Sequence, residues 1–252
     1  MSMQLHELVS YLDTYLRIAE IPDYAGALNG LQVANAGQVS RLAVAVDASA
    51  RSIQGTVERK CDLLLVHHGL FWDGNQPVTG RRYRRLKALL EGDLAVYSAH
   101  LPLDVHPQVG NNAVLARELG VAIEDGFGDY KGTAVGVRGR LDISREALTA
   151  RLDDLLGGPV RLIPGGSERI ATVAVVTGGA GSMLPEAAAL GIDALVTGEG
   201  SHHTWFDAME GGVNAYYGGH YATETWGVRA LAGHIQEQFG LPWEFLDLPT
   251  GL

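Results

Sequence analysis

Two adjacent histidines, His67 and His68, follow a short apolar run and precede Gly69 in the stretch DLLLVHHGLFW, residues 62–72. The apolar run predicts a buried strand. In open α/β sheets, ligands bind beyond the carboxyl ends of the strands, so the pair occupies a position suited to a metal ion or a substrate. Neighbouring side chains of an extended segment point in opposite directions. Both histidines can therefore bind one ligand only if the chain turns, which Gly69 permits.

Two further segments combine imidazole and carboxylate at one spacing. Each has a tyrosine, then a histidine, then a carboxylate four residues later: YSAHLPLD contains His100 and Asp104, and YGGHYATE contains His220 and Glu224. Such ligands suit zinc, iron, manganese or nickel, and bridging carboxylates allow two ions to bind together. Residues four apart share a helix face, so His220 and Glu224 can reach one ion if a helix begins there. A lone histidine at a strand end is often only hydrogen-bonded, but the repeated pattern favours metal binding.

The chain also contains an internal similarity. LAVAVD at residues 42–47 aligns with VAVVTG at residues 173–178, a shift of 131 residues (173 minus 42), and the same shift places DLLLVHHG over DALVTGEG. Chance likeness between α/β units explains the strands alone equally well, but the paired histidine and carboxylate endings favour a true repeat. We therefore predict an α/β fold of two similar α/β domains related by internal duplication, residues 1–127 and 128–252, each presenting ligands at strand ends.

Apolar periodicity predicts the elements that position these segments. A first helix is expected from residue 5 to near Pro22, and further helices are expected at residues 49–58, 81–91, 111–119, 144–157, 184–190, 204–210 and 222–239. Strands are expected at residues 42–46, 63–66, 94–97, 134–137, 172–176, 194–197, 213–217 and 243–249. Parallel strands need a crossover helix, so residues 42–46 and 63–66 are expected to be parallel neighbours. Residues 126–166 are glycine-rich and predict a connector with strands of its own.

Composition restricts the classes of function. The chain has 252 residues, 46% hydrophobic and 19% charged, which predicts a folded protein of one large or two modest domains. A formal charge of -10 argues against a general basic surface that follows nucleic-acid phosphates. The run RRYRR at residues 81–85 leaves a local basic patch open, although a charge run is more often a solvated helix face.

Cysteine content and the amino terminus indicate a compartment. The single cysteine, Cys61, excludes an internal disulfide framework, suits a reducing environment and is expected to serve packing. The amino terminus lacks a secretory signal pattern, and no apolar run reaches the length needed to span a membrane. We therefore expect a soluble cytoplasmic protein.

Several motifs resemble one known family, the NIF-three-like proteins, also called type-two GTP cyclohydrolase I homologues. These motifs are VHHG, HLPLD, the asparagine pair at 111–112, TGE at 197–199 and GHYATE at 219–224. The resemblance covers nearly the whole chain and implies a dinuclear metal centre between duplicated halves and a homohexameric ring. The implied ligands of the two divalent ions are His67, His68, Asp104, His220 and Glu224, with Glu224 as the bridge. Longer relatives carry an inserted domain, and the short segment at 126–166 indicates that this chain lacks it.

Other side chains have competing interpretations. His100 and Glu199 are candidates for proton transfer or for supporting the ligands. His202 and His203 are expected to open a helix, and His106 to lie on the surface. The loop GGAGS at residues 178–182 lacks the ending of a P-loop and is expected to be a tight turn. Phe71 and Trp72 can stack on a base or pack in the core.

Two hypotheses of function follow. In the first, two divalent ions activate water for a hydrolase that acts on a small molecule, and the family name points to the guanine ring of GTP. In the second, the protein is a non-catalytic ring scaffold that binds metal or a partner protein. An open coordination position separates the two hypotheses, and a sequence cannot reveal one.

Overall fold

The computed structural model describes residues 2–251, whose contacts divide into two compact units. The first contains the chain up to Leu103 together with Gly227–Leu248, and the second contains Asp104–Trp226 and the tail from Pro249. Each unit has a mixed α/β fold around one main sheet. Within residues 2–251, no helix has the length and apolar character needed to cross a bilayer.

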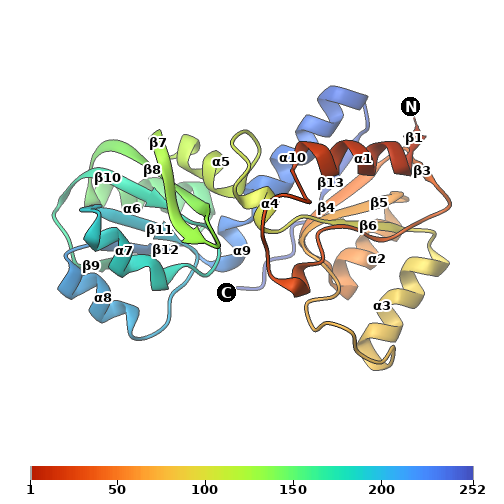
Figure 1. Ribbon diagram of the computed structural model, residues 1–252, viewed down its shortest axis with the longest axis horizontal. Coiled ribbons are helices and arrows are strands. Elements are labelled where there is room, and N and C mark those ends of the chain that lie inside the picture. The colour runs from red at the N-terminus through yellow and green to blue at the C-terminus, as the bar shows by residue number, and fades with distance from the viewer. Residues whose placement is uncertain (1, 252) are drawn as a thin grey trace. The chain divides into compact units, whose positions relative to one another are not determined.

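The sheet of the first unit has the strand order β13-β4-β5-β6-β2 (Figure 1). Its strands are β2 (Gly30–Val33), β4 (Leu42–Asp47), β5 (Leu63–His68), β6 (Ala95–Ser98) and β13 (Trp243–Phe245). Strands β13, β4, β5 and β6 are parallel, and β2 is antiparallel to β6. The expected parallel pairing of the two apolar runs is confirmed, with Leu42 opposite Leu63 and Asp47 opposite His68.

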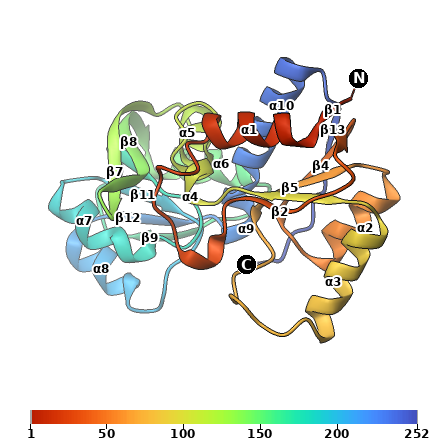
Figure 2. The ribbon, with the colours of Figure 1, turned by 45° about the vertical axis from the view of Figure 1, so that its right-hand side comes forward.

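Helices cover both faces of this sheet, which explains why its strands are continuous apolar runs. Helices α1 (Leu5–Tyr15) and α10 (Thr225–Phe239) lie on one face, and α2 (Ala50–Glu58) and α3 (Gly80–Glu91) lie on the other (Figures 1 and 2). Ile53 of α2 and Leu89 of α3 pack on alternate residues of β4 and β5. Small paired strands β1 (Met3–Gln4) and β3 (Gln38–Val39) and the short helix η1 (Ala25–Ala27) complete the unit.

The sheet of the second unit has the order β7-β8-β10-β11-β12-β9. Its strands are β7 (Ala122–Tyr130), β8 (Thr133–Ser144), β9 (Arg161–Pro164), β10 (Arg169–Val175), β11 (Ala194–Thr197) and β12 (Asn214–Tyr217). Strands β10, β11 and β12 are parallel, and the other three are antiparallel to their neighbours. The strand expected at residues 134–137 lies within β8, which is longer because exposed Arg140 and Asp142 alternate with buried Gly139 and Leu141 beyond the short apolar run. Strand β7 was not predicted, because its first five residues are exposed and include Glu124 and Asp125.

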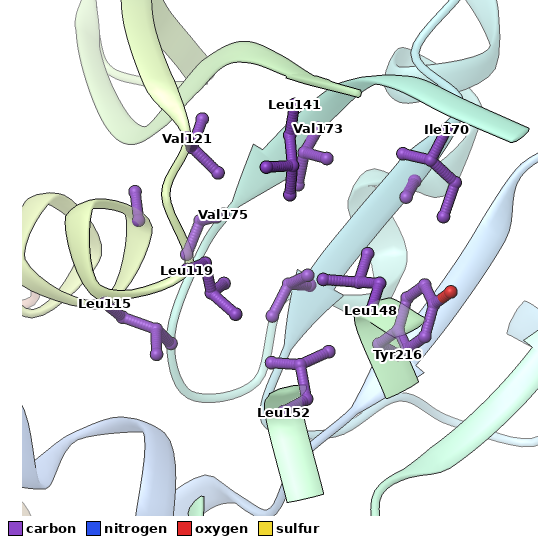
Figure 3. Packing of buried hydrophobic residues seen from close by; sticks show 13 residues of the cluster. Leu115, Leu119, Val121, Leu141, Leu148, Leu152, Ile170, Val173, Val175 and Tyr216 are labelled. Atoms are coloured by element: carbon purple, nitrogen blue, oxygen red, sulfur yellow. The ribbon is translucent and has the colours of Figure 1, made fainter. Parts of the chain in front are cut away.

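The core of the second unit lies between its sheet and two helices (Figure 3). Leu115 of α5 (Asn111–Glu118) and Leu148 and Leu152 of α6 (Arg145–Leu156) pack on Val173 and Val175. Ser144 caps α6 as expected, since its hydroxyl accepts a hydrogen bond from Ala147 N. The remaining helices are α4 (Leu101–Asp104), η2 (Gly181–Met183), α7 (Leu184–Ala189), α8 (Thr204–Gly211) and α9 (His220–Thr223).

The helix expected at residues 222–239 is interrupted. It is divided into α9 and α10, and Glu224 lies at the break with φ of -103° and ψ of 5°. The apolar pattern marks only the long α10, because the single turn of α9 places one histidine and one buried tyrosine at a strand end and has no repeating apolar face. The interruption sets the position of Glu224 independently of the regular helix that follows.

Candidate metal centre

Three histidines of the first unit lie together at the carboxyl ends of neighbouring strands. His67 and His68 are the last residues of β5, and His100 follows β6. One ligand atom from each lies within 4.8 Å of the others, and the ring centroids of His67 and His68 are 4.6 Å apart. Both histidines are still part of β5, and their ring planes are inclined at 49° to each other, so the turn expected at the strand end is not what brings the two rings together.

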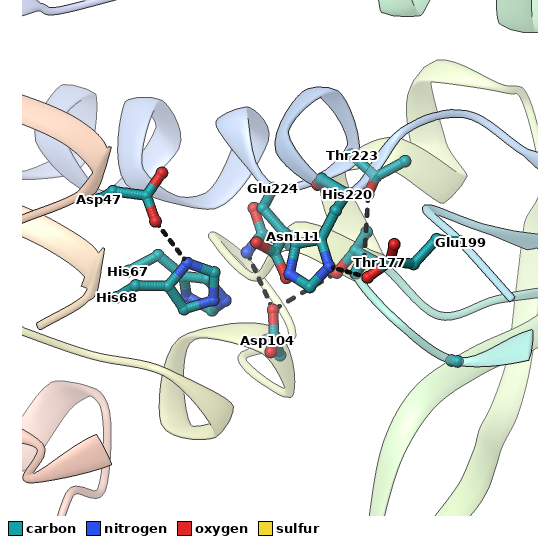
Figure 4. A network of polar contacts seen from close by, with 12 residues as sticks. Asp47, His67, His68, Asp104, Asn111, Thr177, Glu199, His220, Thr223 and Glu224 are labelled. Carbon is teal, nitrogen blue, oxygen red and sulfur yellow. Dashed lines mark hydrogen bonds and ion pairs between the residues drawn. The ribbon is translucent and has the colours of Figure 1, made fainter. Parts of the chain in front are cut away.

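Each of these imidazoles has an oxygen acceptor at Nδ1. His67 Nδ1 is 3.0 Å from the carbonyl of Ala99, and His68 Nδ1 is 3.0 Å from Oδ1 of Asp47 (Figure 4). His100 Nδ1 is 2.9 Å from Oδ1 of Asp23. An oxygen at Nδ1 holds the proton there, so the lone pair that can bind a metal is on Nε2. This arrangement is typical of metal-bound histidines.

The supporting carboxylates were missed in the sequence. Asp47 ends β4 directly opposite His68, and a polar residue at the end of the neighbouring strand was the available signal. Asp23 lies in the loop after α1, where no spacing connects it with His100. It accepts hydrogen bonds from His100, Asn29 and the amides of Tyr24 and Leu101. Burial raises the pKa of Asp23, but the bond and charge of His100 and the other donors outweigh burial and lower it overall.

In the second unit, His220 lies between two carboxylates. Its Nδ1 is 2.8 Å from Oε1 of Glu199, and its Nε2 is 3.2 Å from Oε1 of Glu224 (Figure 4). The hydrogen bond with Glu224 outweighs burial and, with the charges of both carboxylates, raises the pKa of His220 to about 9. Without a metal, His220 is therefore an imidazolium at neutral pH. Its Nε2 could hold a metal ion in place of that proton, while its Nδ1 would still donate to Glu199.

Glycines permit the close packing around Glu224, which is 3% exposed. Gly178 has φ of +70°, and a Cβ there would meet Oε1 of Glu224 at 2.3 Å. A Cβ on Gly198 would meet the carbonyl of Gly178 at 2.7 Å. The loop GGAGS bends at Gly178 and Gly179 and leads into η2, and its first glycine makes room for the carboxylate.

Asp104 has a different environment. It is 7% exposed, and its Oδ1 accepts a hydrogen bond from Asn111 Nδ2 at 2.9 Å and a longer one from Thr177 Oγ1 at 3.4 Å. Asn112 donates to the backbone carbonyl of Asp104. In the part of the chain that the structure describes, Asp104 belongs to no group of three converging metal-binding side chains.

The remaining candidates are placed as follows. His106 was expected on the surface, but it is 8% exposed because its Nδ1 accepts the amides of Gln108 and Val109 and folds the ring against its own loop. His202 and His203 are exposed, and His203 is the N-cap residue of α8. The Trp72 ring is 38% exposed and packs edge-on against His100, with centroids 4.8 Å apart.

The chemistry of these donors fits a divalent metal ion. Imidazole and carboxylate form the ligand set of zinc, iron, manganese and nickel sites, and the histidines are already oriented by oxygen acceptors. The side chains could therefore bind metal. The fold and the site define a mixed α/β protein with two mixed sheets and groups of histidine and glutamate able to bind a metal ion.

Comparison with known proteins identifies the family. A profile of Duf34/NIF3 (NGG1p interacting factor 3) matches residues 3–250, so the chain belongs to this family. It is 45% identical over 248 residues to the "GTP cyclohydrolase 1 type 2 homolog" of Deinococcus radiodurans, covering 98% of this chain and 94% of that protein. The Halobacterium salinarum protein of the same name is 44% identical over 256 residues, with coverage of 99% and 100%. The crystal structure of TTHA1606 from Thermus thermophilus superposes with a TM-score of 0.91 at 43% identity, covering 99% of this chain and 100% of that one.

The ion pair of His220 predicts a pH-dependent stability of the metal-free protein. The folded pKa of about 9 exceeds the ordinary 6.5, so the stabilisation is complete below pH 6.5 and is lost as the pH rises to 9. Because the His220 side chain is 33% exposed, we expect the loss to be at most about 2 kcal/mol. Urea unfolding across this range should show the loss in the wild type and in the exposed control His202→Gln. If the stability of His220→Gln fell with pH as steeply as that of the wild type, the loss could not be assigned to the ion pair of His220.

The contact of Gly178 with Glu224 can be tested against a glycine of similar conformation. Gly191 has φ of +65° and no neighbouring atom within 4 Å of the position that a Cβ would take, whereas a methyl group on Gly178 collides with Glu224. We expect Gly178→Ala to displace the carboxylate and bring the pKa of His220 from about 9 back toward 6.5. Gly191→Ala introduces the backbone strain alone and should leave that pKa unchanged. Proton NMR titration of the imidazole measures both, and equal shifts in the two variants would refute the contact.

Proposed function

We propose that the protein is a metal-dependent hydrolase in which His67, His68, Asp104, His220 and Glu224 hold two divalent ions. The observation that carries the proposal is shared by all four histidines near these positions: each has an oxygen acceptor at Nδ1. Three of these acceptors are carboxylates, those of Asp47, Asp23 and Glu199, and carboxylates that orient histidines in this way are typical of metal sites. The nearly complete burial of Glu224 supports its role as the bridging ligand.

The substrate class is proposed from the relatives. The proteins of Deinococcus radiodurans and Halobacterium salinarum carry the name "GTP cyclohydrolase 1 type 2 homolog", which favours a guanine nucleotide whose ring is opened by water. Divalent ions would supply Lewis acidity and lower the pKa of water. Trp72, which is 38% exposed and lies beside His100, offers an aromatic surface on which a base can stack.

His100 and Glu199 have distinct proposed roles. His100 moves a proton at Nε2, because Asp23 holds its Nδ1 and stabilises the imidazolium that forms when it accepts a proton. Glu199 orients His220 through Nδ1 and is 55% exposed in its side chain, so it also has access to solvent protons. His100 can alternatively serve as a third nitrogen ligand beside His67 and His68, and metal content separates these roles.

We also propose that the two units arose by duplication. In the first, Asp62 Oδ2 accepts the amides of Ser40 and Arg41; in the second, Asp193 Oδ2 accepts the amides of Ala171 and Thr172. These six positions keep the shift of 131 residues found in the sequence. The boundary between residues 127 and 128 stays a prediction.

A buried tyrosine at corresponding places in the two units, in β6 of the first and β12 of the second, supports the duplication. Tyr97 in β6 donates to Asp13 of α1, and Tyr216 in β12 donates to Arg145 O at the start of α6. Sheet register places Tyr97 opposite Leu65 and Tyr216 opposite Val196. The strands therefore align Tyr97 with Tyr216, one residue away from the alignment expected from the histidines.

A homohexameric ring is proposed from the family resemblance. Exposed Trp205, Phe206 and Met209 on α8, at 44%, 47% and 39% exposure, support an interface between copies of the chain. Sedimentation velocity should give a hexamer for the wild type and smaller species for Phe206→Glu. A wild-type monomer would contradict the ring.

Metal content and turnover test the hydrolase. We expect two ions per chain in protein from metal-replete cells and fewer than one in Glu224→Gln and in His68→Gln. If Glu224 and His68 bind the same ions, the double variant should lose little more metal than either single variant. His100→Gln should keep its metal and lose GTP turnover by about 100-fold or more, as expected for a proton-transfer group.

An exposed carboxylate far along α10 provides the control for these variants. Glu237→Gln removes an exposed carboxylate of α10 and should retain both metal and turnover. Full metal occupancy without GTP turnover would exclude this reaction and favour a metal-binding scaffold. Fewer than one ion per wild-type chain would refute the dinuclear centre. Loss of metal in His100→Gln would make this residue a ligand.

A further inference from the structure

An arginine cluster lies at the beginning of α3 in the first unit. Four of the 19 basic residues occupy residues 81–85, in a chain of formal charge -10. Arg81 and Arg84 are exposed, whereas Arg82 and Arg85 are partly buried. Residues three apart share a helix face, so Arg82 and Arg85 point toward the unit while Arg84 points to solvent. The run is therefore more than a solvated helix face.

Arg82 is held in place by the loop of residues 71–75. Its Nη1 donates to Asp73 Oδ1 at 3.1 Å and to Gly74 O at 2.9 Å, and its guanidinium stacks on the Phe71 ring at 5.1 Å from the centroid. The side chain is only 15% exposed. Its Nε is buried and has no acceptor among residues 2–251. A fixed guanidinium with an unused donor is prepared for an oxygen ligand.

Two adjoining hollows open beside Arg82. The larger, about 410 Å³, is lined by Ala25, Leu28, Phe71, Gly74, Asn75 and Arg82. The smaller, about 20 Å³, lies among Phe71, Asp73 and the three arginines Arg81, Arg82 and Arg85. The smaller hollow has room for a water molecule or for one oxygen of an anion. The larger one has room for the rest of a small molecule.

The charges around the smaller hollow are unbalanced. Three guanidinium groups line it together with one carboxylate, that of Asp73. Burial and the like charge of Arg81 lower the pKa of Arg85, while Asp73 and Asp47 oppose this change. Guanidinium groups stay protonated in proteins, so the repulsion among these arginines remains. An anion placed among them would relieve it.

The same loop connects the arginines with the candidate metal centre. Trp72, whose ring packs on His68 and His100, stands in the chain between the hollow-lining residues Phe71 and Asp73. On the other side, Ala25 and Leu28 line the larger hollow, and the adjacent Tyr24 ring lies 6.1 Å from His100. A molecule bound in the hollows thus lies next to the residues that surround the histidines.

We propose that Arg81, Arg82 and Arg85, with the loop of residues 71–75, bind a phosphate or diphosphate group of the substrate. The proposal rests on the proposed function only in taking the histidines as the reaction centre, and it assigns the phosphate groups of a phosphorylated substrate to a specific site in the first unit. Arg82 and Arg85 hold the anion through guanidinium donors. The negative charge of the chain as a whole discourages other sites for anions.

Pyrophosphate binding to the metal-depleted full-length protein tests the site, because metal ions would otherwise bind phosphate themselves. Isothermal titration calorimetry should show one saturable site per chain. Arg85→Gln should weaken binding by about tenfold or more, since it removes a charged donor. Arg84→Gln removes the same charge from the exposed face and should change the affinity by less than about twofold.

Competition experiments show whether the site recognises the phosphate groups of a nucleotide. GTP should compete with pyrophosphate and guanosine should not. Arg82 also supports its loop, so it is tested with the conservative substitution Arg82→Lys, which keeps the positive charge but loses the forked guanidinium donors. Thermal unfolding verifies that each variant is folded. Absence of saturable pyrophosphate binding to folded wild type would overturn the proposal.

Two other results would also overturn it. An equal loss in Arg84→Gln and Arg85→Gln would indicate a diffuse basic face. Tighter binding of a single-stranded oligonucleotide, weakened equally by both substitutions, would assign that face to nucleic acid. Because the protein is metal-depleted, arginine-dependent binding of pyrophosphate would stand even if the hydrolase assignment failed, and failure to bind would leave the metal and turnover results untouched.

Discussion

Parallel pairing of β4, β5 and β6 is the constraint on which the histidine group depends. The three strands run in register, so their carboxyl ends meet at one edge of the sheet. Asp47 ends β4, His67 and His68 end β5, and His100 follows β6. Two helices on each face bury the strands and prevent a shift of register, since a slip by one residue would reverse every side chain. The apolar core thus fixes the positions of the polar residues beyond it.

In the second unit, close backbone approach has the same importance. Gly178 and Gly198 follow β10 and β11, and the residues at these positions must lack a Cβ for the loops to pack around Glu224. The break between α9 and α10 then places Glu224 beside His220. The buried carboxylate and the imidazolium compensate each other's charge in the metal-free protein, and ligation of a cation would replace that proton.

The arginine cluster shows how little a charge run reveals in sequence alone. The overall charge argues against a general basic surface, and exposed Arg84 fits a solvated helix face. Arg82 differs because Phe71, Asp73 and Gly74 from a separate loop contact it. Together with Trp72 in the same loop, it links a basic hollow to the aromatic surroundings of the histidines.

The sequence by itself determined the family, the α/β class, most helices and strands of the two sheets and the positions of the histidines at strand ends, because apolar periodicity and short motifs are local properties. It did not reveal Asp23 behind His100, because these residues are distant in the chain and only the tertiary structure joins them. It underestimated β8, in which exposed Arg140 and Asp142 interrupt the apolar run, it missed β7, whose first five residues are exposed, and it misplaced His106 on the surface. Tertiary structure alone decided which nitrogen of each histidine has an acceptor and which arginines line a hollow, because hydrogen-bond partners and burial depend on segments that the sequence does not place side by side.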